Sequence, residues 1–377
     1  MKNMNKRDFL RLGLTGVGGI CMLKNQKMSA AMNMMNDEKP WKWSKEAIHY
    51  TQTPRGVKCM LCPNECSIRE GNTGTCRNRV NYKDKLYSIA YGNPCAAHVD
   101  PIEKKPLMHY LPGIYAYSIA TAGCNFACLN CQNWDISQSS PKETSNIDLM
   151  PARVIEEALK NNCQSIAYTY AEPIAFYEYM YDTAKLAREK KIKNVLVSNG
   201  YINEKPLREL CKYLDAANIN LKSFSDDIYL RLNAGKLQPV LNTLKIMKEE
   251  NVWLEITNLV IPSWTDDFDM IKKMCDWIVA NGLENYPLHF LRFHPMYKLT
   301  QLPSTPVNIL QKAKEIAIKA GCKYVYVGNV TDPKALNTYC PKCKGLVLER
   351  SGYTIVKNNI QNGKCKSCGE KISGVWN

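Results

Sequence analysis

The chain has 377 residues, of which 45% are hydrophobic and 23% charged, a composition typical of a globular protein with two or three domains. Its formal net charge of +15 would suit nucleic acid, but residues 106–333 carry equal numbers of basic and acidic residues, so the excess lies at the two ends and nucleic-acid binding is not favoured. No stretch after residue 30 reaches the roughly 18 apolar residues that a membrane span needs.

Residues 1–35 read as a basic, signal-like extension. An apolar stretch from Leu12 to Leu23 follows a basic start, and it is too short to cross a bilayer. The residues Lys6-Arg7-Asp8-Phe9-Leu10 resemble a twin-arginine export signal with Lys in place of the first Arg. We expect either an exported protein or a plain basic extension on a cytoplasmic one. The abundant metal-type cysteines favour the reducing cytoplasm.

Residues 36–110 form an N-terminal module with four cysteines at Cys59, Cys62, Cys66 and Cys76. CxxC spacing in a long chain indicates a metal site, not disulfides. Both zinc and an auxiliary iron–sulfur cluster suit four thiolates in a compact loop. The spacing does not separate the two, and zinc is the simpler interpretation.

Residues 111–333 alternate between strand and helix patterns. In chain order, the predicted strands cover residues 115–120, 165–170, 194–198, 216–222, 252–262, 287–295 and, less clearly, 324–328. Helical patterns follow most of these strands. One ends at Lys190, one lies around Leu207 to Leu214, and the others cover residues 239–250, 268–281 and 307–320. Such alternation predicts an α/β fold with a parallel sheet, and six or seven units predict a partial or complete barrel.

Residues 334–377 contain two CxxC pairs, Cys340 with Cys343 and Cys365 with Cys368. Two such knuckles at this separation predict a zinc ribbon. A unit this small lacks a sufficient core, so zinc would stabilise its fold.

Polar residues stand at the ends of the predicted strands. In an α/β barrel these ends meet at one mouth, where the chemistry takes place. The residues that we expect there are Glu172, Ser198, Asn199, Lys222, Thr257, Asn258, His289, Arg292 and His294.

Cys124, Cys128 and Cys131 follow the first strand with CxxxCxxC spacing. Structural zinc and most [4Fe–4S] clusters take four protein ligands, so a set of three leaves one metal position open. A cluster with one open iron accounts for this pattern better than zinc or a chance triplet. The spacing resembles that of the radical S-adenosylmethionine (SAM) superfamily, in which the methionine group of SAM chelates the open iron and an electron from the cluster releases a 5′-deoxyadenosyl radical.

Longer stretches resemble one group within that superfamily. "IATAGCNFACLNCQNW", "YTYAEP", "AANINLKSFSDD", "LHFLRFHPMYKLT" and the upstream "CMLCPNEC" and "AAHVDPIEKKPL" are similar to AmmeMemoRadiSam-system radical SAM enzymes, relatives of the pyruvate formate-lyase activating enzymes. The resemblance implies a partial (β/α)6 barrel. It also implies that Glu172 holds the amino group of SAM, and that Ser198, Asn199, Lys222 and His294 contact its ribose, carboxylate or adenine. Asn220 departs from the family, which often has Asp there, and this changes the charge balance that the resemblance implies around Lys222.

The implied function is hydrogen abstraction from an unidentified small-molecule or protein substrate. The implied partners are an electron donor such as flavodoxin or ferredoxin, together with Memo-like and AMMECR-like proteins. A second hypothesis is the activation of a glycyl-radical enzyme. A third is a non-catalytic metal-binding scaffold for protein or nucleic acid, against which the set of strand-end residues argues.

Overall fold

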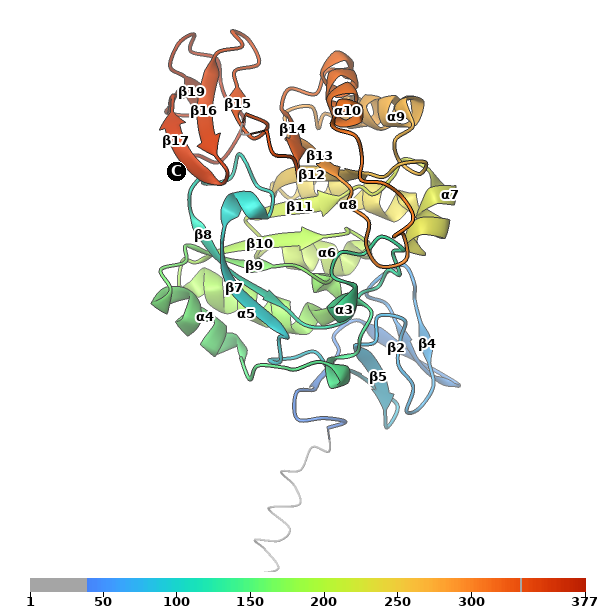
Figure 1. Ribbon diagram of the computed structural model, residues 1–377. Helices are drawn as coiled ribbons and strands as arrows, with labels where there is room; N and C mark the ends of the chain where they lie inside the picture. The colour runs from blue at the N-terminus through green and yellow to red at the C-terminus, as the bar shows by residue number, and fades with distance from the viewer. Residues whose placement is uncertain (1–38, 333) are drawn as a thin grey trace, which may run out of the picture. The chain divides into compact units, whose positions relative to one another are not determined.

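The computed structural model describes residues 39–332 and 334–377, so the signal-like segment 1–35 lies outside the described residues. The chain divides into two units, Met1–Lys42 and Trp43–Asn377. The second unit contains every helix and strand reported below (Figure 1).

A mostly parallel sheet of eight strands forms the centre of this unit. Its strands are β7 (Ala96–Pro101), β8 (Tyr115–Ala120), β9 (Ser165–Tyr168), β10 (Lys193–Ser198), β11 (Ala216–Asn220), β12 (Trp253–Val260), β13 (Leu288–Arg292) and β14 (Val325–Gly328). They lie in chain order, with β8 to β14 parallel and β7 antiparallel to β8 at one edge. The predicted α/β class is therefore confirmed, and all seven predicted strands are present.

The number of units differs from the six that the resemblance implied. Seven parallel strands follow one another, because the last predicted strand, β14, pairs with β13. Among the described residues β7 and β14 do not pair with each other, so the sheet remains open. β7 also comes from the stretch that we assigned to the N-terminal module, and its pairing with β8 makes it part of the central sheet.

Eight α-helices of the described residues connect the strands. They are α3 (Trp134–Ser137), α4 (Pro151–Lys160), α5 (Tyr177–Glu189), α6 (Glu204–Cys211), α7 (Asp226–Ile228), α8 (Leu237–Glu249), α9 (Phe268–Ala280) and α10 (Val307–Ala320). Local signals set their ends: the Asp267 side chain accepts a hydrogen bond from the Met270 N–H at 2.7 Å where α9 begins, and Gly321 at φ +112° ends α10. No helix in 39–332 or 334–377 is long and apolar enough to cross a membrane.

Short helical turns complete the connections. Three are 3₁₀ turns, η1 (Ile102–Lys104), η2 (Pro141–Glu143) and η3 (Pro173–Phe176), and one is a π-helix, η4 (Tyr229–Asn233). A single π-helical turn is uncommon and often occurs at a functional site. η4 lies beside the cysteine loop described below.

The two faces of the sheet differ because side chains alternate along each strand. Ile166, Ile219, Ile256 and Phe290 belong to the main core cluster, which also contains the apolar residues of the helices. On the other face, Ala116, Ala167, Val195 and Ala216 pack with Ile102, Leu107 and Tyr110 in a second, smaller cluster. The segment 102–110 therefore covers this inner face near the N-terminal ends of the strands, and the C-terminal ends remain available for a site.

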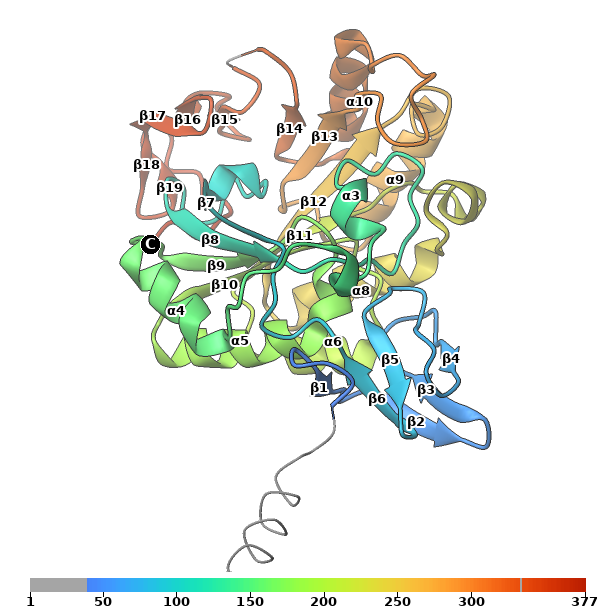
Figure 2. The same ribbon diagram turned by 60° about the horizontal axis from the view of Figure 1, so that its bottom comes forward.

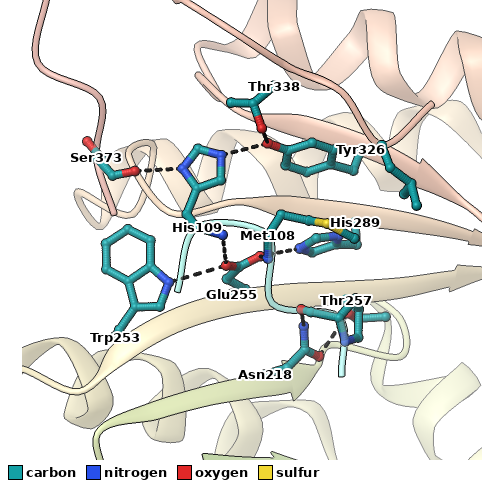
Figure 3. Close-up of polar contacts among 12 residues, drawn as sticks. Met108, His109, Asn218, Trp253, Glu255, Thr257, His289, Tyr326, Thr338 and Ser373 are labelled. Carbon is teal, nitrogen blue, oxygen red and sulfur yellow. Dashed lines mark hydrogen bonds and ion pairs between the residues drawn. The ribbon is translucent and has the colours of Figure 1, made fainter. Parts of the chain in front are cut away.

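A buried polar network extends this cover (Figure 3). Glu255 on β12 accepts hydrogen bonds from the backbone N–H groups of Met108, at 2.9 Å, and His109, at 2.8 Å, and contacts His289 Nε2 at 2.6 Å. Burial alone would raise the pKa of Glu255, but the hydrogen bond and charge of His289 lower it below its ordinary value. The carboxylate thereby fixes the segment that closes the inner face.

The N-terminal module consists of two small three-stranded sheets. Their strands are β1 (Lys45–Glu46), β2 (Tyr50–Thr53), β3 (Gly56–Cys59), β4 (Ser67–Ile68), β5 (Arg79–Tyr82) and β6 (Lys85–Ser88). The sheets lie near the start of α6 (Figure 2), where the Asn203 amide donates to the Met60 carbonyl at 2.8 Å. The module is thus attached to the central sheet at the carboxyl end of β10.

The C-terminal segment forms the short strands β15 (Thr338–Tyr339), β16 (Leu346–Ser351), β17 (Thr354–Asn358), β18 (Ile360–Gln361) and β19 (Lys364–Cys365). The buried guanidinium of Arg350 donates to the Met108 carbonyl at 2.6 Å, and the His109 ring lies between the Ser373 carbonyl and the Tyr326 hydroxyl at 2.6 Å from each. The segment therefore packs on the same loop that closes the inner face of the sheet.

Candidate functional site

The cysteine loop begins directly after β8, at a glycine that no other residue could replace without strain. Gly123 adopts φ +100°, and a Cβ there would lie 2.1 Å from Asn78 Oδ1. The chain then passes Cys124, which is buried, and Cys128 and Cys131, which are half-buried. A tight turn against the N-terminal module therefore directs all three cysteines to the carboxyl end of the sheet.

Nitrogen donors lie beside two of the three cysteine sulfurs. The Phe126 backbone N–H donates to Cys124 Sγ at 3.4 Å, and Asn233 Nδ2 donates to Cys128 Sγ at 3.1 Å. Asn233 ends the π-helix η4 and was not among the residues predicted from the sequence. Burial raises the pKa of the Cys124 and Cys128 thiols. A bound metal would therefore be needed to stabilise their thiolate form.

A cavity of about 500 Å³ opens beside these thiols. Residues from neighbouring strand ends line it together with the three cysteines; they include Thr169, Glu172, Val197, Asn199, Asn220, Lys222, Thr257, Leu259 and Leu291. This volume lies within the range of pockets that bind cofactors and small molecules. The structure thus brings Glu172, Asn199, Lys222 and Thr257 together with the cysteine triplet.

Glu172 is the most constrained polar group of the cavity. It is buried, and its carboxylate accepts hydrogen bonds from Ser198 Oγ at 2.7 Å and from the N–H groups of Asn199 and Ile174, at 2.8 and 3.1 Å. Burial raises its pKa. Ser198 is absent from the cavity lining, so it orients Glu172 from behind.

Lys222 follows β11, two strands along the sheet from β9, and its side chain has a neutral partner. Its ammonium donates to Asn220 Oδ1 at 3.1 Å, and Asn220 Nδ2 in turn donates to the Ser198 carbonyl at 3.3 Å. No carboxylate neutralises the lysine at this contact, because position 220 is Asn and not Asp. The cavity therefore presents a cation on this wall and a buried carboxylate on the wall formed by Glu172.

Other predicted strand-end residues do not line the cavity. His294 is exposed and contacts Ser304 Oγ through Nδ1 at 3.0 Å. Arg292 Nε donates to the Thr305 carbonyl at 2.8 Å, and His289 is buried against Glu255. The side chains of Arg292 and His294 hold loops in place, and His289 helps to hold the inner face of the sheet.

A lysine that was not predicted from the sequence also lines the cavity. Lys105, in the segment before β8, donates to Asp100 Oδ2 at 2.6 Å, and the Tyr170 hydroxyl donates to the same carboxylate. Both Lys105 and Tyr170 line the cavity. Burial lowers the pKa of Lys105 to about 8. Nothing local in the stretch "AAHVDPIEKKPL" indicates that β7 pairs with β8, so the sequence alone does not place Lys105 at the cavity.

The four C-terminal cysteines, Cys340, Cys343, Cys365 and Cys368, form a compact set. Their sulfurs all lie within 4.8 Å of one another, with Cys340 and Cys368 at 3.6 Å and Cys343 and Cys365 at 3.8 Å. Four thiolates at the Zn–S distance of about 2.3 Å in a tetrahedron stand about 3.8 Å apart. The geometry fits a single tetrahedral metal ion.

The four N-terminal cysteines, Cys59, Cys62, Cys66 and Cys76, line one common cavity together with Arg79. No three of their sulfurs are as close together as those of the C-terminal set, which is the only such group among the described residues. The two four-cysteine sites thus differ in geometry.

Comparison with known proteins shows that residues 118–278 match the family model of the Radical SAM superfamily. An uncharacterized protein of Methanocaldococcus jannaschii is 43% identical over 334 residues, which are 88% of this chain and 99% of that protein. The pyruvate formate-lyase 1-activating enzyme of Escherichia coli K12 is 25% identical over 220 residues, or 54% of this chain and 89% of the enzyme.

Solved structures have a lower sequence identity to this chain. The crystal structure of Streptococcus suis SuiB bound to S-adenosylmethionine has 15% sequence identity and a TM-score of 0.46, and the match covers 64% of this chain and 56% of SuiB.

Proposed function

The chain belongs to the Radical SAM superfamily, and from this premise we propose that it cleaves SAM reductively and uses the 5′-deoxyadenosyl radical to abstract a hydrogen atom from a substrate. One observation carries the proposal. Three cysteines with open-site spacing and a buried glutamate line the same cavity at the carboxyl ends of the parallel strands.

The residues around Cys124, Cys128 and Cys131 suit an iron–sulfur cluster. Their three sulfurs do not gather within 4.8 Å of one another, as the ligands of a single ion would. The N–H donors from Phe126 and Asn233 would stabilise thiolates. A [4Fe–4S] cluster held by these thiolates would keep one iron open for SAM and supply the electron that breaks its C–S bond.

The cavity walls supply groups of both charges for the methionine part of SAM. Glu172 would accept hydrogen bonds from the ammonium group, with Ser198 holding the carboxylate in place. Lys222 would pair with the SAM carboxylate, and Asn199, which donates to Asn125 Oδ1 at 2.8 Å, would fix the cysteine loop against this wall. A role for His294 in contacting the cofactor stays a prediction.

We further propose an AmmeMemoRadiSam-type enzyme, with Memo-like and AMMECR-like partner proteins and flavodoxin or ferredoxin as the electron donor. The motifs quoted above support this assignment. The substrate is a small molecule or a protein, and the walls formed by Lys105 and Tyr170 would face it.

Activation of a glycyl-radical enzyme is the second candidate. It is favoured by the similarity to pyruvate formate-lyase activating enzymes. Radical formation on the glycine of a co-purified partner, detected by electron paramagnetic resonance (EPR), would support this candidate over the first.

For the C-terminal four-cysteine site we propose structural zinc. The sulfur separations of 3.6 and 3.8 Å support a closed tetrahedral shell, which leaves no open position for chemistry. For the chain as a whole we propose the reducing cytoplasm as its location, because thiolate-held metals persist there.

The test of the proposed function is anaerobic reconstitution with iron and sulfide, followed by reduction and assay of 5′-deoxyadenosine. The wild-type protein should form it, and a variant with Cys124, Cys128 and Cys131 replaced by Ala should not. Undiminished formation by that variant would exclude the proposed cluster. The matched control replaces Cys163, a cysteine outside the three groups, with Ala and should retain activity.

A further inference from the structure

The N-terminal four-cysteine site is a small cavity with four thiols around it. Its volume is about 20 Å³, and Cys59, Cys62, Cys66 and Cys76 all line it. Three of these thiols are buried, and Cys66 is half-buried. Four thiols around one space are a donor set for zinc or an iron–sulfur cluster.

The separation of the sulfurs distinguishes these two centres. At the C-terminal site all four sulfurs lie within 4.8 Å of one another, whereas among the described residues no three sulfurs of the N-terminal module do so. One zinc ion would hold its thiolates about 3.8 Å apart. In a [4Fe–4S] cluster each thiolate binds a different iron, so the sulfurs stand further apart. The same chain therefore contains one site with the spacing for zinc and one with a wider spacing.

Arg79 provides a second, independent observation. It lines the cavity and is 1% exposed, and its Nη2 atom contacts both oxygens of the buried Glu178, at 2.8 and 3.0 Å. Its Nε and Nη1 atoms have no hydrogen-bond partner within the described protein. Unpartnered buried donors are costly, and the sulfides and thiolates of an anionic cluster are acceptors that would satisfy them.

The cavity shares a wall with the cysteine triplet. Asn125, which follows Cys124, lines it, and Asn64 of the module donates to the Asn125 carbonyl at 2.9 Å. Ile174 and Ala175, two and three residues after Glu172, line it as well. On the outer side are the half-buried Cys66 and the exposed Thr75.

We propose that Cys59, Cys62, Cys66 and Cys76 hold a second [4Fe–4S] cluster that relays electrons to the cluster at the triplet. A low-potential one-electron donor is oxidised, the module cluster is reduced and then reoxidised, and the electron passes to the triplet cluster, so the module undergoes no net change. The relay rests on the proposed function, whereas binding of the second cluster does not.

Metal analysis of the full-length chain tests the second cluster. The Cys124/Cys128/Cys131→Ala variant, reconstituted anaerobically, should retain about four irons and about four sulfides per chain, with an EPR signal after reduction that added SAM does not change. Absence of iron, with about two zinc ions per chain in its place, would overturn the proposal. Four irons in this variant together with no SAM cleavage by the wild type would reject the proposed function and leave the second cluster standing.

The relay is tested with Cys66→Ala, the least buried of the four ligands. With flavodoxin as donor, SAM cleavage should slow by about tenfold or more, while with titanium(III) citrate, which reduces clusters directly, it should change by less than about twofold. Equal flavodoxin-driven rates in a variant that has lost the module's irons would overturn the relay. If Cys66→Ala does not fold, the same comparison is made with Arg79→Lys, which keeps the charge but loses the two unpartnered donors.

Discussion

Gly123 and Cys76 are in direct contact: a Cβ on Gly123 would lie 2.5 Å from the Cys76 carbonyl oxygen. Gly123 directly precedes the first cysteine of the triplet, and Cys76 is the last cysteine of the N-terminal module. The turn that directs the triplet into the cavity is therefore formed against the module, so the two cysteine groups depend on each other structurally.

Gly123→Ala should disturb both cysteine groups. The substitution adds a Cβ against Asn78 and Cys76 at φ +100°, and we expect a loss of about 1–3 kcal/mol in the free energy of unfolding, with reduced iron uptake. Urea denaturation and iron analysis measure the two effects. Gly71→Ala is the matched control, because Gly71 also has a positive φ, +74°, but nothing lies within 4 Å of the added Cβ. Equal iron uptake by both variants would contradict the structural dependence.

Glu172→Gln should weaken SAM binding by roughly ten- to a hundred-fold, because a charge-assisted hydrogen bond contributes about 1.5–3 kcal/mol. Ser198→Ala, which removes one hydrogen bond to this carboxylate, should have a smaller effect in the same direction. Calorimetry on the reconstituted protein measures both. Glu156→Gln, on the exposed face of α4, serves as the control. Unchanged affinity with an intact cluster would rule out the proposed role of Glu172.

Asn233→Ala should make the triplet cluster harder to reduce. Removing the N–H donor 3.1 Å from Cys128 Sγ leaves more negative charge on the sulfur, and a hydrogen bond of about 1 kcal/mol corresponds to about 40 mV for one electron. An EPR-monitored redox titration gives the potential. Asn242→Ala, an exposed residue of α8, should leave it unchanged. A potential that rises in Asn233→Ala would refute this account.

Stability should fall in mild acid because of His109. Burial lowers the pKa of His109 to about 4, below the roughly 6.5 of the unfolded chain. Between these values the unfolded state binds more protons, so the free energy of unfolding decreases by up to about 1.4 kcal/mol per pH unit as the pH falls from 6.5 towards 4, and this contribution is fully present above 6.5. Urea denaturation of the wild type and His109→Gln at pH 7.5 and 5.5 tests it. Equal pH dependence of the two proteins would be inconsistent with this origin.

Cys343→Ala should remove about one zinc ion per chain and leave the iron content unchanged, because its sulfur completes the compact C-terminal set. Metal analysis after anaerobic purification decides this. If the wild type contains more iron and sulfide than two clusters need, and Cys343→Ala loses this excess, then the C-terminal site binds a cluster instead. Cys163→Ala again supplies the control.

The strands and the central features of the cavity could be predicted from the sequence because both depend on local patterns. Apolar runs of strand length marked β8 to β14, and the residues that follow such runs in a parallel sheet meet at one edge. Glu172, Asn199 and Lys222 accordingly meet there.

The features that could not be predicted depend on how deeply a side chain is buried or on pairing between segments of the chain. His289 stands three residues before the end of β13, and its side chain is buried against Glu255 instead of lining the cavity. Lys105 reaches the cavity wall only because β7 pairs with β8. The metal type of the N-terminal module depends on distances between sulfurs, which ligand spacing along the chain does not define.

The contact between His109 and Ser373 has a consequence for biosynthesis. It joins residues 264 positions apart, and the partners of segment 102–110 on β14 and in the C-terminal segment are therefore synthesised long after segment 102–110 itself. At about 5–20 residues per second, the ribosome exposes His109 many seconds before Ser373 emerges. Until then the inner face of the sheet lacks these contacts, so the segment that covers it should become fixed late in synthesis.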